Sequence, residues 1–183
     1  MHGMQKKQRM KHVFFLLAGV FAPLPAHAAQ IRIEDAFSPR DGASRLVERA
    51  VYDARRSVLV AAYSFTSKPI ARALVAAHGR GVDVRVVCDK NQYNRPIENF
   101  LSARGIPVRV SSQYNLMHDK FMVIDGATVE LGSFNYTYSA EYDNAENVMV
   151  VHNIPGIAAD YARQWNDIWA GARTLKESSS LRW

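Results

Sequence analysis

The sequence predicts an α/β fold in which a mixed β-sheet is sandwiched by helices, within one domain per chain. Apolar stretches of strand length alternate with amphipathic stretches of helix length, which is typical of a sheet covered by helices. Helix-length crossovers make the earlier strands parallel, whereas an Asp-Gly pair between two later strands predicts an antiparallel hairpin. A hydrophobic content of 48% without repeats or low-complexity linkers fits one globular core.

The strands are read from apolar runs bounded by turn residues. Residues 57–65 form a continuous apolar run, as in a central strand that is buried on both faces. Residues 82–88 alternate between apolar and polar side chains and end at the only cysteine, Cys88, which we expect to be a buried thiol. The expected strands are residues 30–37, 57–65, 82–88, 106–112, 118–125, 127–134 and 146–152.

The helices are read from apolar stripes and from end signals. Ser67 before Lys68-Pro69 is typical of a helix start, because serine caps the first turn and proline is accepted there. The final helix is expected to turn one apolar stripe inward, formed by Ile157, Tyr161, Trp165, Ile168 and Trp169. The expected helices are residues 38–55, 67–79, 96–104 and 155–172.

The first 28 residues have the three parts of a secretory signal peptide. A basic start is followed by an apolar stretch at 13–22 and by the small-x-small site Ala26-His27-Ala28. The apolar stretch is too short to span a bilayer, which takes about 20 residues. We therefore expect cleavage after Ala28, a periplasmic or secreted protein, and no stable membrane insertion afterwards. The expected domain is residues 29–175, followed by a polar tail at 176–183.

Cleavage would change the charge of the protein. The chain carries a net charge of +6, but the signal contains four basic residues and no acidic ones, so the charge falls to +2. Removing 28 of the 183 residues leaves 155, which suits one domain. A mild positive charge permits a polyanionic partner without requiring one.

The polar residues that indicate the chemistry lie close together in the later strands. His118 and Lys120 are two residues apart, so on a strand they project to the same side. Ser133 and Asn135 have the same spacing on the returning strand. Two adjacent strands can therefore place an imidazole, a cation and neutral hydrogen-bonding groups on one patch. Asp125 has the opposite parity, which favours a structural role at the end of its strand.

These residues read His118-x-Lys120-x4-Asp125-x6-Gly132-Ser133-x-Asn135, which matches the HKD signature of the phospholipase D superfamily. The chain also resembles the small periplasmic Nuc-type endonucleases over essentially the whole mature chain. That likeness includes the run Tyr63-Ser64-Phe65-Thr66, the run Ala145-Glu146-Asn147 and the tryptophan-rich last helix.

The resemblance implies a phospholipase D-like fold and a phosphodiesterase that needs neither metal nor cofactor. One histidine attacks phosphorus to give a phosphohistidine, and a second histidine protonates the leaving oxygen. Because the chain has one motif, the resemblance implies a homodimer with a shared active site where two copies of His118 meet. His78 or His152 could instead serve as the second histidine of a monomer, but neither lies in a matching motif.

The expected roles follow from the motif. The catalytic residues are His118, Lys120 and Glu146, and the ligands of the substrate phosphate are Lys120, Ser133 and Asn135. Glu146 matches the family carboxylate that orients the histidine; otherwise it is an ordinary acid at a strand edge. Gly132 and Asp125 are structural, and Gly132 permits a close backbone approach. A metal site at Asp119 and Asp125 is rejected, because Lys120 lies between them and repels a cation.

A basic and aromatic loop is expected to contact nucleic acid, with a solvated loop as the alternative. It contains Lys90, Tyr93, Asn94 and Arg95. Tyr136 and Tyr138 could stack on bases or pack in the core.

The expected substrate is DNA, with RNA as a further candidate. The alternatives are a phospholipid phosphodiesterase and a catalytically silent nucleic-acid-binding module.

Overall fold

The computed structural model describes residues 30–175, so the expected signal peptide and polar tail lie outside the described residues. The strands are β1 (Arg32–Ser38), β2 (Ser57–Ala62), β3 (Asp83–Asp89), β4 (Val108–Ser111), β5 (Lys120–Ile124), β6 (Thr128–Gly132), β7 (Glu146–His152) and β8 (Arg173–Thr174). The helices are α1 (Ala43–Asp53), α2 (Lys68–Gly79), α3 (Arg95–Ser102), α4 (Tyr138–Tyr142) and α5 (Pro155–Gly171), and a 3-10 turn, η1, covers Gln92–Asn94.

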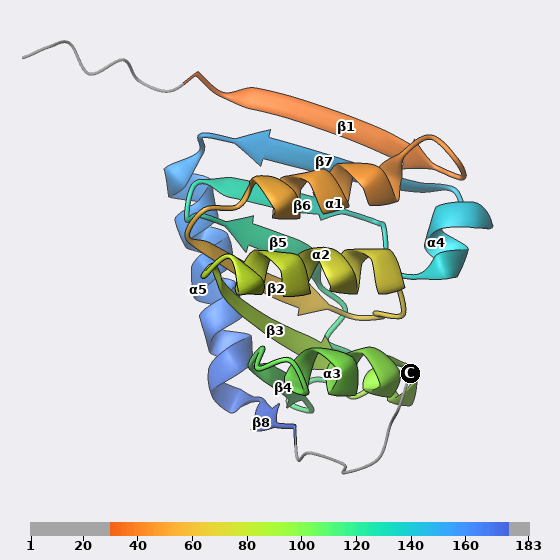
Figure 1. The fold of residues 1–183 in the computed structure, drawn as a ribbon, viewed down its shortest axis with the longest axis vertical. Helices are drawn as coiled ribbons and strands as arrows, with labels where there is room; N and C mark the ends of the chain where they lie inside the picture. The colour runs from red at the N-terminus through yellow and green to blue at the C-terminus, as the bar shows by residue number, and fades with distance from the viewer. Residues whose placement is uncertain (1–29, 176–183) are drawn as a thin grey trace, which may run out of the picture.

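All the strands join one mixed sheet in the order β1-β7-β6-β5-β2-β3-β4-β8. Helices α1, α2 and α3 cover one face and α5 crosses the other, so the predicted three-layer arrangement is confirmed (Figure 1). Strands β2, β3 and β4 are parallel, as the crossovers predicted. Strand β1 runs in the same direction as β2, but it lies at the edge of the sheet, where its neighbour is the antiparallel strand β7. Its alternating charged side chains suit an edge position.

Two apolar layers hold the sheet between the helices. The layer beneath α1, α2 and α3 includes Val60, Val86 and Met122, whereas the layer beneath α5 is centred on Trp165. The indole of Trp165 is fully buried and donates a hydrogen bond to the Val60 carbonyl at 2.9 Å. The buried stripe of α5 runs through Ala158 rather than Ile157, which is 51% exposed, so the expected inward position of Ile157 was wrong.

Several boundaries differ from those expected. Helix α1 begins at Ala43, not after Ser38, because Arg40 and Gly42 adopt positive φ angles that cannot continue a helix. Strand β2 ends at Ala62, and the chain beyond it turns toward α2. The short elements α4 and β8 were not expected.

No helix within residues 30–175 is long and apolar enough to cross a membrane.

The expected hairpin between β5 and β6 is present. Its turn residues Asp125 and Gly126 have φ angles of 55° and 67°, and the Ala127 N–H donates to the Ile124 carbonyl at 3.2 Å, as in a type I′ turn. Pairing of Phe121 with Leu131 sets the start of β5 beside the end of β6. Pairing of Ala62 with Lys120 then brings the end of β2 to the same edge of the sheet.

Candidate active site

All the motif residues except Asp125 converge at one end of the sheet, where β2 and β6 end and β5 and β7 begin. These four strands are neighbours in the sheet, so their ends form a continuous rim. A pocket of about 650 Å³ opens there. It is lined by His118, Asp119, Lys120, Phe121, Leu131, Gly132, Ser133, Asn135, Glu146 and Tyr161.

His118 and Lys120 lie side by side, although His118 precedes β5 instead of belonging to it. The Lys120 Nζ atom is 3.2 Å from His118 Nδ1, and it donates a hydrogen bond to the His118 carbonyl at 2.8 Å. Burial lowers the pKa of Lys120, while the charges of Asp119 and Glu146 act in the opposite direction. The pocket therefore holds an imidazole and a partly desolvated cation within reach of one substrate group.

Tyr63 supports both side chains, and the motif alone did not single it out. Its ring centroid lies 4.4 Å from that of His118, and Lys120 Nζ lies 5.1 Å from the centre of the Tyr63 ring. The backbone fixes this position, because the Tyr63 N–H donates to the Asp119 carbonyl at 3.0 Å and the Asn94 amide donates to the Tyr63 carbonyl at 2.9 Å. The available signal was its place directly after an apolar central strand.

Ser133, Asn135 and Glu146 complete the rim of the pocket. Ser133 Oγ donates to Glu146 Oε2 at 2.6 Å, and Asn144 donates to Glu146 Oε1 at 3.0 Å. Within the described chain, Glu146 thus contacts Ser133 and Asn144 and makes no hydrogen bond to His118. The Asn135 side-chain oxygen is buried without a hydrogen-bond partner among residues 30–175.

Gly132 and Asp125 both lie against the backbone of a neighbouring segment. A Cβ atom on Gly132 would lie 2.1 Å from the backbone oxygen of Asn147, so a side chain there would displace β7. Asp125 lies at the far end of β5 from the pocket. Its carboxylate accepts backbone N–H bonds from Arg55, Arg56 and Ser57.

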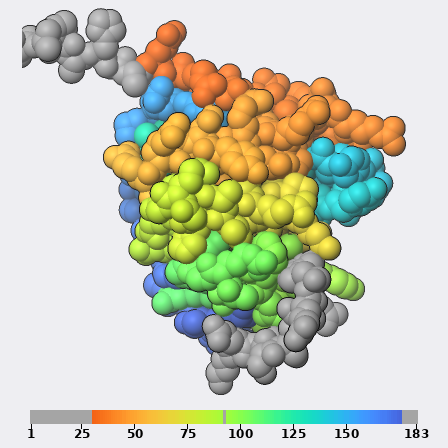
Figure 2. Space-filling model, viewed as in Figure 1, coloured from red at the N-terminus to blue at the C-terminus, as the bar shows by residue number. Residues whose placement is uncertain are grey.

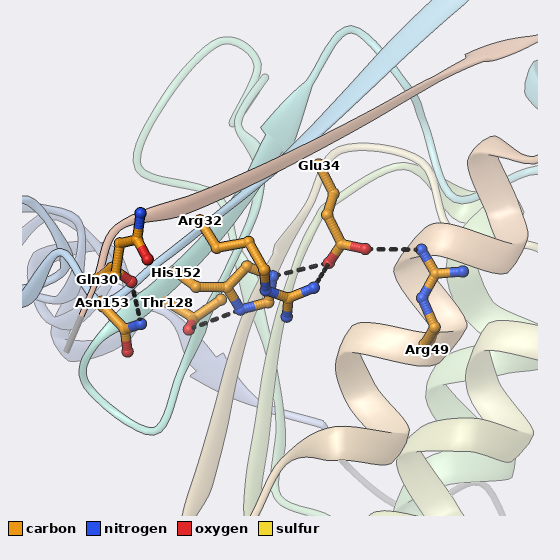
Figure 3. Close-up of polar contacts among 7 residues, drawn as sticks. All are labelled: Gln30, Arg32, Glu34, Arg49, Thr128, His152 and Asn153. Carbon is orange, nitrogen blue, oxygen red and sulfur yellow. Dashed lines mark hydrogen bonds and ion pairs between the residues drawn. The ribbon is translucent and has the colours of Figure 1, made fainter.

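His78 and His152 lie at the opposite end of the sheet from His118. Helix α2 begins near the pocket and runs away from it, and His78 is in its last turn. Strand β7 likewise begins at the pocket and ends at His152. The ring of His152 contacts Glu34 Oε1 through Nε2 at 2.9 Å and Thr128 Oγ1 through Nδ1 at 3.4 Å (Figure 3).

The residues of the expected nucleic-acid loop lie in different environments, some exposed and one buried. Tyr93 is 69% exposed, Lys90 donates to the Tyr114 carbonyl at 3.1 Å, and Arg95 pairs with Glu98 at 3.6 Å. Asn94 is fully buried, so its expected contact with substrate was wrong. Its amide instead ties the loop to the end of β2, because it accepts a bond from the Phe65 N–H at 2.7 Å.

The two tyrosines after the motif also differ. Tyr136 is fully buried and donates a hydrogen bond to Glu130 at 2.7 Å, so it packs in the core. Tyr138 is 68% exposed on α4 and remains accessible to a ligand.

The two aspartates considered for a metal site are separated. Asp119 lies at the pocket end of β5 and accepts a hydrogen bond from Gln164 at 3.2 Å, whereas Asp125 is at the other end of the strand. Across residues 30–175, no group of three or more His, Cys, Asp or Glu side chains gathers as metal ligands do.

Comparison with known proteins gives the family. The family model described as "Cardiolipin synthase, PLD-like domain" matches residues 47–169. Nuc from Salmonella typhimurium, a solved phospholipase D family member, is 38% identical with a TM-score of 0.78; the match covers 80% of this chain and 99% of Nuc.

Curated relatives point the same way. Mitochondrial cardiolipin hydrolase from Xenopus laevis is 30% identical over 169 residues, or 91% of this chain and 80% of the relative. A phospholipase D from Rickettsia bellii is 29% identical over 136 residues, or 73% of this chain and 67% of the relative. Together with the site geometry, these matches confirm the predicted fold and motif family: the chain belongs to the phospholipase D superfamily and is a hydrolase of phosphodiester bonds.

Proposed function

We propose that this protein is a periplasmic or secreted nuclease that hydrolyses DNA, and RNA as a further substrate, without a metal ion. The observation that carries the proposal is one pocket in which His118, Lys120, Ser133, Asn135 and Glu146 meet at the strand ends. The 38% identity to Nuc, over nearly all of Nuc, supports the nuclease branch of the superfamily.

The proposed reaction has two steps, in which the second histidine acts first as an acid and then as a base. The Nε2 atom of one His118 bonds to phosphorus as the bond to the leaving oxygen breaks, and a second histidine gives that oxygen its proton. The second histidine then takes a proton from water, whose oxygen attacks phosphorus and releases His118. Lys120 and Asn135 hold the non-bridging oxygens, where negative charge must be stabilised.

The tautomer of His118 depends on where Lys120 lies. Nε2 is nucleophilic only if Nδ1 carries the ring proton, yet Lys120 Nζ sits 3.2 Å from Nδ1 in the free chain. A substrate phosphate would draw the ammonium away, and Nδ1–H could then donate to a carboxylate. Glu146 lines the same pocket and is the carboxylate proposed for this task.

We propose that the second histidine is His118 of a second copy in a symmetric dimer. Within one chain, the other described histidines, His78 and His152, are both at the far end of the sheet. A two-fold axis beside the pocket would instead supply the missing group from the same residue. Apolar side chains on the α5 side of the sheet edge could be buried in such a contact, namely Ile33, Phe37 and Met149.

Cleavage in excess EDTA tests the proposal. The mature protein is incubated in parallel with duplex DNA, single-stranded DNA, RNA and phosphatidyl lipid vesicles. We expect nucleic-acid cleavage that persists in EDTA and disappears in the His118→Ala variant. Complete loss of wild-type cleavage in EDTA would refute the metal-independent mechanism.

A phospholipid phosphodiesterase is the second candidate. It is favoured by the relatives named mitochondrial cardiolipin hydrolase and phospholipase D, which are 30% and 29% identical to this chain. The lipid arm of the same assay separates the two. Lipid hydrolysis without nucleic-acid cleavage would replace the nuclease proposal.

A further inference from the structure

A second groove of about 410 Å³ lies next to the catalytic pocket, where α4 meets the first turns of α1 and α2. Figure 2 shows the cyan residues of α4 against the orange residues of α1 and the yellow start of α2. The segment after β6 lies between the two hollows, which share no lining residue. Asn135 lines the catalytic pocket, Thr137 lines the groove, and the buried Tyr136 separates them.

This connecting segment is fixed to the end of β2. Phe65 and Tyr136 form a parallel bridge, and the backbone N–H groups of Thr66 and Ser67 both donate to the Tyr136 carbonyl, at 2.8 and 2.9 Å. The fold therefore fixes the position of the groove relative to the catalytic pocket.

Two tyrosines form one wall of the groove. Tyr138 is 68% exposed and Tyr142 is 45% exposed, and their ring centroids are 4.6 Å apart. They lie four residues apart on α4, so they share one face of the helix. Helix α4 is anchored by the buried Ala140 and by the carboxylate of Glu141, which accepts the backbone N–H of Ser44 in α1 at 2.9 Å. This anchoring holds the aromatic pair at the surface instead of in the core.

Two cations form the opposite wall. Lys68 and Arg72 are exposed one turn apart on α2, and both line the groove. The carboxylate of Glu141 also lines it, but this group accepts the backbone N–H of Ser44 at 2.9 Å. The groove thus offers aromatic faces on one side and positive charge on the other, which is the combination that binds single-stranded nucleic acid.

We propose that this groove binds the single-stranded segment that flanks the scissile phosphate, with bases on Tyr138 and Tyr142 and phosphates beside Lys68 and Arg72. The inference rests on the proposed nuclease function and deepens it. Bases within a duplex are stacked on one another and cannot present their faces to the tyrosines. The groove therefore gives the enzyme a preference for single strands over duplexes.

The test measures binding by fluorescence anisotropy in the His118→Ala background, which prevents cleavage. The variants are Tyr138→Ala with Tyr142→Ala, the matching pair of Phe substitutions, and Tyr52→Ala, an exposed tyrosine of α1 outside the groove. The probes are a labelled single-stranded oligonucleotide and an abasic strand of equal length. Hydrolysis of bis(p-nitrophenyl) phosphate by the same variants with His118 intact reports on the catalytic pocket alone.

We expect the double Ala variant to bind the oligonucleotide about 10- to 100-fold more weakly. The same variant should bind the abasic strand and hydrolyse the small diester as the parent does, and the Phe pair and Tyr52→Ala should bind normally. Unchanged oligonucleotide binding, or an equal loss for the abasic strand, would overturn the proposal. If the intact enzyme cleaves lipid and no nucleic acid, the proposed function fails instead, which the cleavage assay shows separately.

Discussion

Lys120 and Asp125 belong to one motif, yet they lie at opposite ends of one strand and do different work. Lys120 faces the pocket and contacts His118, whereas Asp125 binds the backbone that enters β2. The spacing between these two motif residues therefore corresponds to the length of β5, which has five residues. Parity along the strand favoured a structural role for Asp125, but what separates it from Lys120 is its place in the turn after β5, where its φ is 55°.

Replacing Asp125 with Asn tests its structural role. The carboxylate accepts three backbone N–H groups, and an amide would direct its own N–H at one of these donors. We expect the free energy of unfolding to fall by about 1–3 kcal/mol. Denaturant unfolding measures this loss, with Asp167→Asn on the exposed side of α5 as control. A large loss of kcat/KM in the fully folded variant would contradict a purely structural role.

Glu130 provides a pH-dependent contribution to stability. Burial raises its pKa to about 8, against 4.5 for the free side chain. Between these values the unfolded chain releases a proton that the folded chain keeps, so stability falls as pH rises, by up to about 1.4 kcal/mol per pH unit. Glu130→Gln removes this titration, whereas Glu98, whose pKa burial raises to about 7, still titrates in both proteins.

Urea unfolding of wild type and Glu130→Gln at several pH values checks the prediction. The variant should gain stability relative to wild type between about pH 5 and pH 8. Parallel stability curves would show that Glu130 is already ionised in the folded protein.

At the scale of elements, β1 is an edge strand held by a charged cluster. Glu34 contacts Arg32 at 2.7 Å, Arg49 of α1 at 3.1 Å and His152 of β7 at 2.9 Å (Figure 3). Burial opposes the ionisation of Glu34, but the His152 hydrogen bond and the two arginine charges outweigh it. The pKa of Glu34 therefore lies below its ordinary value.

Because its pKa is depressed, Glu34 stabilises the folded chain at pH values above 4.5, the ordinary pKa of the side chain. This contribution to stability is lost as the pH falls below that value. We expect amide exchange in β1, corrected for its intrinsic pH dependence, to accelerate as the pH falls below 4.5. Glu34→Gln should exchange rapidly at neutral pH as well, whereas Asp35→Asn on the opposite face should not. Equal protection of β1 in all three proteins would refute the cluster's role.

The sequence was informative where an element is long enough to carry a pattern. The capped start of α2 at Ser67 and the Asp125-Gly126 turn were predictable, because local backbone chemistry specifies both. Helix α4 has five residues and β8 has two, so neither carries a measurable period. The pairing of β1 with β7 joins distant parts of the chain, and only tertiary packing determines it.

The same distinction applies to the site. His118, Lys120, Ser133 and Asn135 were predictable because a motif of fixed spacing contains them, and the structure brings all four to one pocket. Tyr63 was not, because its contact with His118 depends on β2 lying beside β5. The role of Asn94 was misjudged because a polar residue in a basic loop gives no sign that it is buried.

At the scale of the whole molecule, the pocket is half of the active site that we propose. One described chain places one histidine at the pocket, and the proposed chemistry needs two. If both chains of a dimer supply His118 to one shared site, the activity of dimers that mix wild-type and variant chains can be predicted. A dimer of one wild-type and one His118→Ala chain should be inactive, although it contains one intact chain.

Activity of mixed dimers is the most direct measurement of this claim. Wild-type and His118→Ala chains are unfolded together, refolded at varied ratios and assayed on single-stranded DNA in EDTA, with native mass spectrometry to verify mixed dimers. We expect activity to fall with the square of the wild-type fraction, so that an equal mixture retains about one quarter of it. A linear fall, with about one half retained, would show that each chain acts with its own histidine and would contradict the shared site.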